Sequence, residues 1–130
     1  MANTLSIITT AKAFDQACQD LEQACKTEGY GVLGHHDIGK TLRSKGIAFG
    51  EECRIYEICQ PFHASAILGI DLSLSTSLPC RISVYTENGV TCFGMVNPHQ
   101  LLTGQSDDPR LEPIARLVQQ ETSRILELAR

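Results

Sequence analysis

The chain has 130 residues, of which 42% are hydrophobic and 20% are charged, and its formal net charge is −4. This length and composition are typical of one folded domain, so we expect residues 1–130 to form a single domain. The acidic balance argues against nucleic acids or anionic membranes as partners, because both attract basic proteins. The sequence also has neither the ~20-residue apolar run of a membrane helix nor a secretory signal pattern, so we expect a cytoplasmic protein without a membrane partner.

A long helix is predicted near the start of the chain, from Ala11 to Glu28. From Phe14 onward, apolar residues fall at offsets 0, 3, 4, 7, 10 and 11, which places them on one helical face. Thr10 is expected to cap the start of this helix, and Gly29 follows its last turn.

Several shorter elements follow from β-prone runs and from turn residues. Pro61 is expected to end one strand, because proline has no N–H to donate to a ladder. The expected strands are Leu5 to Thr9, Tyr30 to Ile38 and Glu51 to Cys59, the expected short helices or turns are Lys40 to Gly46 and Phe62 to Leu68, and Asp71 to Leu78 is an irregular return.

The clearest local signal is the Asn88-Gly89 dipeptide, which favours a type I′ hairpin turn. It joins two alternating runs, Cys80 to Glu87 and Val90 to Asn97. With those two residues as the turn, the register places Val84 opposite Phe93 on a face that points into the core.

A second long helix is predicted at the end of the chain, after a short helix or turn from His99 to Thr103. Asp107-Asp108-Pro109 resembles a helix start, and apolar residues then recur at helical spacing up to Ala129. Together, the hairpin and the two long helices predict a core that contains Leu21, Ile82, Val84, Phe93, Met95, Ile114, Val118 and Ile125.

The order of these elements predicts an α+β fold, with a single curved antiparallel sheet of about five strands and the two long helices on one face. Strands and helices do not alternate regularly, which disfavours a doubly wound parallel sheet. The other sheet face would carry Tyr85, Val90 and Val96. Exposed apolar sheet surface usually marks an interface or a ligand site, so we expect a symmetric homodimer.

The six cysteines need an explanation other than disulfides, because cytoplasmic thiols stay reduced. They form no C-x-x-C pair, and their spacing is unlike that of a zinc site, so we expect no metal. Cys18 and Cys25 lie on the stripe of the first helix and are expected in the core. His35 and His36 are neighbours in a predicted strand and would point to opposite faces, which disfavours a shared ion.

One constellation is a candidate thiol or ligand site. Cys59, Pro61 and His63 lie where a strand breaks into a helix, and Cys80 and Arg81 lie where a later strand begins. If these two strands are neighbours, the two groups approach each other. A helix N-terminus and nearby positive charge favour the thiolate form of cysteine. The alternative is that both prolines of this region end strands and that both cysteines are small core residues.

The order and spacing of several short motifs resemble a bacterial and archaeal family, the domain of unknown function 302. The resemblance extends from about Phe14 to Ala129, with Gln60 at a position where many members have Asn. It implies an α+β fold like that of the TATA-box-binding protein, often as a homodimer, with no established reaction. The motifs that carry it are Gly29-Tyr30, Cys59-Gln60-Pro61, Leu78 to Tyr85, Glu87 to Val90 and Met95 to Pro98.

Two function classes remain open at this stage. The first is a non-catalytic module that binds a small ligand or regulates, through the sheet face or a dimer seam. The second is a thiol-dependent protein, a redox protein, sulfur carrier or soft-metal binder, that works through Cys59 and Cys80. An enzyme would need convergent titratable groups, and only Glu57 and His63 join the two cysteines as candidates. The sequence names no cofactor and no substrate.

Overall fold

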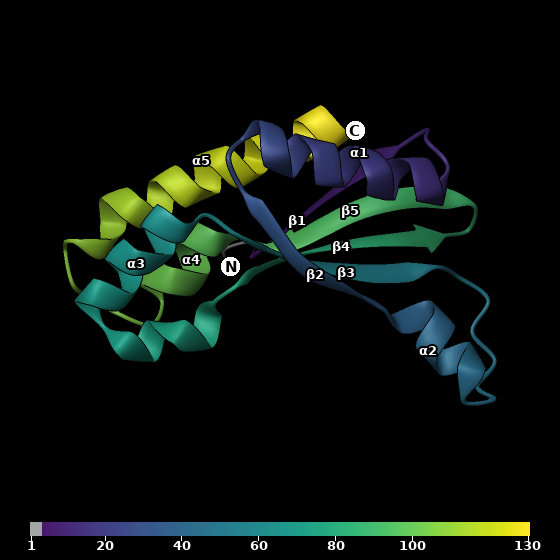
Figure 1. Cartoon of the computed structure of the whole chain (residues 1–130), viewed down its shortest axis with the longest axis horizontal. Coiled ribbons are helices and arrows are strands. Elements are labelled where there is room, and N and C mark those ends of the chain that lie inside the picture. Colours follow the sequence, from purple (N-terminus) through teal and green to yellow (C-terminus); the bar gives the residue numbers. More distant parts are fainter. Residues whose placement is uncertain (1–3) are drawn as a thin grey trace.

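The protein forms one five-stranded antiparallel sheet with two long helices on one face (Figure 1). The computed structural model describes residues 4–130. The strand order is β1-β5-β4-β3-β2, so the last four strands form a meander and the first strand joins its far edge. The strands are β1 (Leu5–Thr10), β2 (Gly31–Asp37), β3 (Cys53–Cys59), β4 (Cys80–Glu87) and β5 (Val90–Val96). The predicted fold class is confirmed.

The two long helices lie side by side above one sheet face in Figure 1, and no described helix crosses the opposite face. One short helix projects from one end of the sheet, and the remaining helices gather at the other end. The helices are α1 (Phe14–Thr27), α2 (Ile38–Ser44), α3 (Pro61–Ile70), the 3₁₀ helix η1 (Leu72–Ser77), α4 (Pro98–Thr103) and α5 (Leu111–Ala129).

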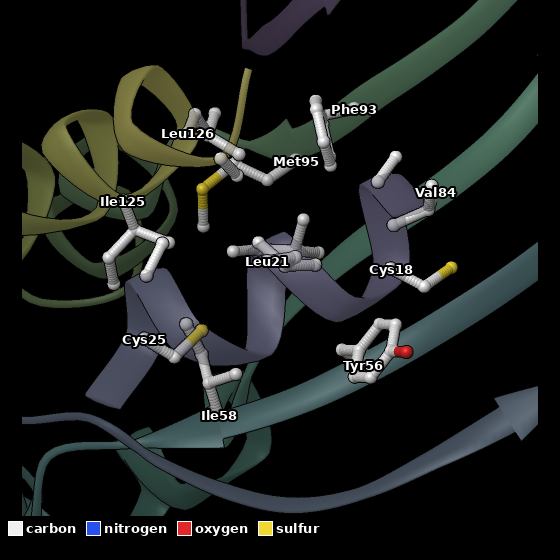
Figure 2. Close-up of a cluster of buried hydrophobic side chains, with 14 of the residues drawn as sticks. Cys18, Leu21, Cys25, Tyr56, Ile58, Val84, Phe93, Met95, Ile125 and Leu126 are labelled. Carbon is white, nitrogen blue, oxygen red and sulfur yellow. The ribbon is translucent and has the colours of Figure 1, made fainter. Parts of the chain in front are cut away.

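The main core lies between the sheet and the two long helices, as the labelled side chains of Figure 2 show. Cys18 and Cys25 of α1 are each 1% exposed and pack among apolar side chains, which confirms their prediction as core residues. The expected pairing of Val84 with Phe93 is also confirmed, and both side chains are fully buried. Alternation along the strands therefore directs Ile82 and Val84 toward the helices and their neighbours toward the opposite face.

A second, smaller core lies under the end of the molecule where the short helices gather. Its buried members are Ile67, Leu74, Leu102, Leu111 and Ala115. Ile114, which we expected in the core, is only partly buried at the edge of this cluster. The stripe of α5 runs through Leu111, Ala115 and Val118 instead, so Ile114 lies beside it.

Both long helices begin later than predicted. Thr10 belongs to β1, where it pairs with Thr91, and α1 starts only at Phe14 with Ala13 as its N-cap residue. The hydroxyl of Thr10 accepts from the Lys12 backbone N–H and caps no helix. At the other helix, Pro109 precedes the N-cap residue Arg110, because Asp108 first forms a turn whose carbonyl accepts from the N–H of Leu111.

Candidate functional site

Three cavities concern the predicted site residues, and one of them shares lining residues with each of the other two. We call them the thiol pocket, the side pocket and the open-face hollow. The thiol pocket is lined by Cys59, His63 and Cys80 among mainly apolar side chains. The side pocket lies among η1, α4 and the ends of β4 and β5, and the open-face hollow lies on the sheet face that no described helix covers.

The thiol pocket brings together three of the predicted site residues. Cys59 ends β3, His63 lies in the first turn of α3, and Cys80 begins β4 opposite Ile58. The space among them is about 20 Å³, which holds about one water molecule and no larger ligand.

A hydrogen-bonded cluster supports the histidine of this pocket. Tyr30 is 3% exposed and donates its hydroxyl to Oε1 of Glu121 at 2.9 Å. Nε2 of His63 lies 2.8 Å from the same carboxylate oxygen, and the rings of Tyr30 and His63 meet edge to face. The side chain of Gln60 caps α3 by accepting from the backbone N–H of His63 at 2.9 Å. His63 is therefore held at both its backbone N–H and its ring.

The electrostatics of the pocket favour the protonated form of the Cys80 thiol. Burial, with a smaller contribution from the neighbouring Cys59, raises the pKa of Cys80 to about 11. Burial and the adjacent Glu121 carboxylate also raise the pKa of Tyr30. Since a thiolate is the reactive form of cysteine, Cys80 is almost entirely in its unreactive form near neutral pH.

The other two predicted site residues lie outside the thiol pocket. Pro61 is the first residue of α3 and is exposed. Arg81 follows Cys80 in β4, so its side chain points to the opposite sheet face, where it lines the side pocket and the open-face hollow. Tyr30 and Glu121, which hold His63, were not predicted as site residues.

The open-face hollow is the larger space, with a volume of about 400 Å³. Its floor is mainly apolar and comes from four strands. Ile7 and Val96 remain 52% and 43% exposed, so the hollow is wide open to solvent. The residues that line it are Leu5, Ile7, Ile55, Arg81, Ser83, Tyr85, Gly94, Met95 and Val96.

The side pocket, of about 140 Å³, shares lining residues with each of the other two spaces. Arg81, Met95 and Val96 line both the side pocket and the hollow. Cys80 lines both the side pocket and the thiol pocket, together with Pro79 and Leu102. Cys80 and Arg81 are thus consecutive residues that share the side pocket, while of the two Cys80 alone lines the thiol pocket and Arg81 alone lines the hollow.

Within residues 4–130, no group of three His, Cys, Asp or Glu side chains is arranged to hold a metal ion. His36 contacts Glu57 at 3.2 Å, and the His35 ring stacks at a tilt on Tyr56, so the two adjacent histidines serve opposite faces of the sheet. All six cysteines are free thiols. No helix in the described part of the chain is long and apolar enough to cross a membrane.

Comparisons with known proteins agree on one family. The family model of domain of unknown function DUF302 matches residues 6–129. A crystal structure of an uncharacterized conserved DUF302 protein from Bacillus stearothermophilus superposes with a TM-score of 0.93 at 32% sequence identity, and the match covers 99% of this chain and 100% of that one. The comparison with curated proteins found no match.

Proposed function

Because the chain belongs to the DUF302 family, whose description assigns no reaction, we propose a function from its own cavities: a non-catalytic module that binds a small ligand in the open-face hollow. The carrying observation is the volume of about 400 Å³ above a mainly apolar floor. Small-molecule sites in proteins measure about 300–1,000 Å³ and are mostly apolar with a few polar groups. The thiol pocket, at about 20 Å³, is far below that range.

We also propose a symmetric homodimer in which a second copy completes this site. A ligand site buries about 70–90% of its ligand, and a hollow whose Ile7 and Val96 side chains stay about half exposed needs a further wall. A second copy over the same face would supply that wall and would cover the exposed apolar surface. The ligand would then lie at the seam between two copies.

The test compares two variants with matched exposure. Ile7 in the hollow is 52% exposed. Leu128 is 53% exposed and belongs to α5, which packs on the other sheet face (Figure 1). Light scattering at tens of micromolar should give the dimer mass, twice the 14.2 kDa of one chain, for the wild type and for Leu128→Glu. Ile7→Glu should give the mass of a monomer. Calorimetry with 1-decanol should show binding to the first two proteins only. A monomeric wild type would refute the dimer, and no decanol binding would refute the ligand site.

We place this module in the cytoplasm and expect no nucleic-acid partner. Six free cysteines suit a reducing compartment, and the net charge of −4 is unfavourable for a phosphate backbone. A fold of the TATA-box-binding-protein type, which stays a prediction, would not by itself imply DNA binding.

A second candidate function is thiol chemistry, because Cys59 and Cys80 line one cavity with His63. A redox protein or a soft-metal binder could use both thiols, and a sulfur carrier could use one of them. The raised pKa of Cys80 makes this function the weaker candidate, since Cys59 would have to act as the first nucleophile. His63 would be the nearest base, held by Glu121.

Alkylation separates the two candidates, and Cys53 provides the matched control. Cys53 and Cys59 are both half-buried free thiols at opposite ends of β3. With limiting iodoacetamide near neutral pH, the thiol function requires Cys59 to be labelled well before Cys53. The binding module requires slow labelling with no preference for Cys59, and Cys59→Ser should leave decanol binding intact. Mass mapping of the first labelled residue decides between them.

A further inference from the structure

We infer that the ligand of the open-face hollow is an anionic amphiphile, with an apolar body over the sheet and a carboxylate head held by Arg81 at the mouth of the side pocket. This inference rests on the proposed function and names the chemical class of its ligand. Three observations carry it: the side chains that two cavities share as a wall, the free guanidinium in that wall, and the polar groups of the side pocket.

The hollow and the side pocket meet at shared side chains, which are Arg81, Met95 and Val96. Met95 and Val96 are apolar, whereas Arg81 carries the only charge among the residues that line either cavity in the described chain. A ligand that extends from the hollow into the side pocket therefore passes a cation after leaving an apolar floor.

The guanidinium of Arg81 is available to a ligand. Arg81 is exposed, and its side chain makes no ion pair or hydrogen bond with any residue in the described range 4–130. Glu57 lies directly opposite Arg81 in the β3–β4 ladder, but its carboxylate contacts Nε2 of His36 at 3.2 Å. By contrast, Arg43, Arg54, Arg110, Arg116, Arg124 and Arg130 each lie within ion-pair distance of a carboxylate.

The side pocket adds uncharged hydrogen-bonding groups next to this cation. Gln105 of the segment after α4 and Ser77 of η1 both line it, and the Ser77 hydroxyl donates to Oε1 of Gln105 at 2.5 Å. That bond uses the amide oxygen of Gln105 and leaves its NH₂ group as a donor. A donor beside a guanidinium suits an oxyanion, because Arg binds carboxylates through two parallel N–H bonds.

The apolar body is specified by the floor of the hollow. Ile7, Ile55 and Tyr85 come from three different strands and offer no charge to a polar ligand. A fully polar anion would gain binding free energy at Arg81 but would leave this floor in contact with water. An uncharged apolar ligand would gain binding free energy only by covering the floor. The pairing of both features favours an amphiphile over either simpler class.

The test uses two probes of equal chain length, decanoate and 1-decanol, with calorimetry at fixed ionic strength. Arg81→Met keeps an unbranched apolar stem and removes the charge. Its control is Lys26→Met, which also removes one charge from an exposed residue. Lys26 belongs to α1, which packs on the sheet face opposite the hollow (Figure 1). We expect Arg81→Met to weaken decanoate binding by about tenfold, the effect of losing a hydrogen bond between two charged groups. Decanol affinity should change less than twofold, and Lys26→Met should resemble the wild type with both probes.

The two proposals fail in different ways. If the wild type binds decanol and decanoate equally and Arg81→Met changes neither, the head-group inference is overturned and the hollow remains a ligand site. Suppose that the wild type binds neither probe while Ile7→Glu turns a dimer into a monomer. The face is then only an interface between copies, and the ligand site and the head-group inference are both overturned. Decanoate binding that weakens equally in Arg81→Met and Lys26→Met would reflect net charge and would also overturn the inference.

Discussion

Tyr30 donates its hydroxyl to Glu121 at 2.9 Å, across 91 residues of sequence, and so joins the residue just before β2 to the middle of α5. Tyr30→Phe should lower the free energy of unfolding by about 1–2 kcal/mol, because it removes a buried hydrogen bond to a charged acceptor. Urea denaturation measures the loss. In a double-mutant cycle with Glu121→Gln, the two losses should fall short of additivity by at least about 0.5 kcal/mol. Strictly additive losses would show that the pair contributes nothing jointly.

Gln60 and Asn97 occupy equivalent positions, each as the N-cap residue before a proline that begins a helix. The Gln60 side chain accepts from the N–H of His63, and that of Asn97 accepts from the N–H of Gln100. Gln60→Ala and Asn97→Ala should each cost about 1 kcal/mol of stability. Gln60→Asn should be neutral or stabilising, since Asn is a preferred cap. A Gln60→Ala protein as stable as the wild type would show that this cap adds nothing.

Asn88 and Gly89 turn the β4–β5 hairpin with φ values of 51° and 82°. Gly89→Ala should destabilise the protein by about 1–2 kcal/mol, because a side chain disfavours this left-handed conformation. Gly50→Ala is the control, as Gly50 has no positive φ and no heavy atom within 4 Å of the added carbon. Thermal unfolding should show a lower Tm only for the first variant. Equal Tm values would contradict the turn assignment.

Buried thiols make the protein less stable in alkali. Burial raises the pKa of Cys25 to about 12 and that of Cys80 to about 11, from an ordinary value of 9.0. Above pH 9 the unfolded chain releases protons that the native protein retains, so stability is complete below pH 9 and falls as the pH rises toward 11–12. Each thiol should account for about 1 kcal/mol of the loss by pH 10. Urea midpoints at pH 8 and pH 10 measure it.

Cys80→Ala serves as the internal check on this alkaline loss. The variant should be less stable than the wild type at pH 8, because a cavity replaces the sulfur, yet it should lose less stability between pH 8 and pH 10. An identical pH slope in both proteins would mean that Cys80 does not contribute to the alkaline loss.

Local periodicity explains why the fold could be predicted and why the element boundaries could not. The stripe through Cys18 and Cys25 and the Asn88-Gly89 turn each act within a few residues, and both are confirmed. Thr10 and Pro109 carry typical helix-start signals, but tertiary contacts decide their use. Thr10 pairs across the sheet with Thr91, and Pro109 lies in a turn built by Asp108.

The candidate site shows the same division. Cys59 and Cys80 could be grouped because the strands that carry them are neighbours, and His63 follows Cys59 by four residues. Strand alternation, already visible in the sequence, should have separated Arg81 from Cys80. The contacts of Glu121 with Tyr30 and His63 span 91 and 58 residues. No local motif marks contacts of that range, so sequence reasoning had no signal for them.

The place of β1 in the sheet has a consequence for how the protein is made. Leu5 pairs with Val96 and Thr10 with Thr91, so β1 is synthesised long before its partner strand. At translation rates of 5–20 residues per second, the intervening chain takes roughly 4–16 s to appear. The meander from β2 to β5 needs only connections between consecutive strands, whereas β1 needs the chain's longest strand-to-strand closure. The open-face hollow is lined by residues of both strands, Ile7 of β1 and Val96 of β5. A nascent chain therefore forms the hollow only when its first strand pairs with β5.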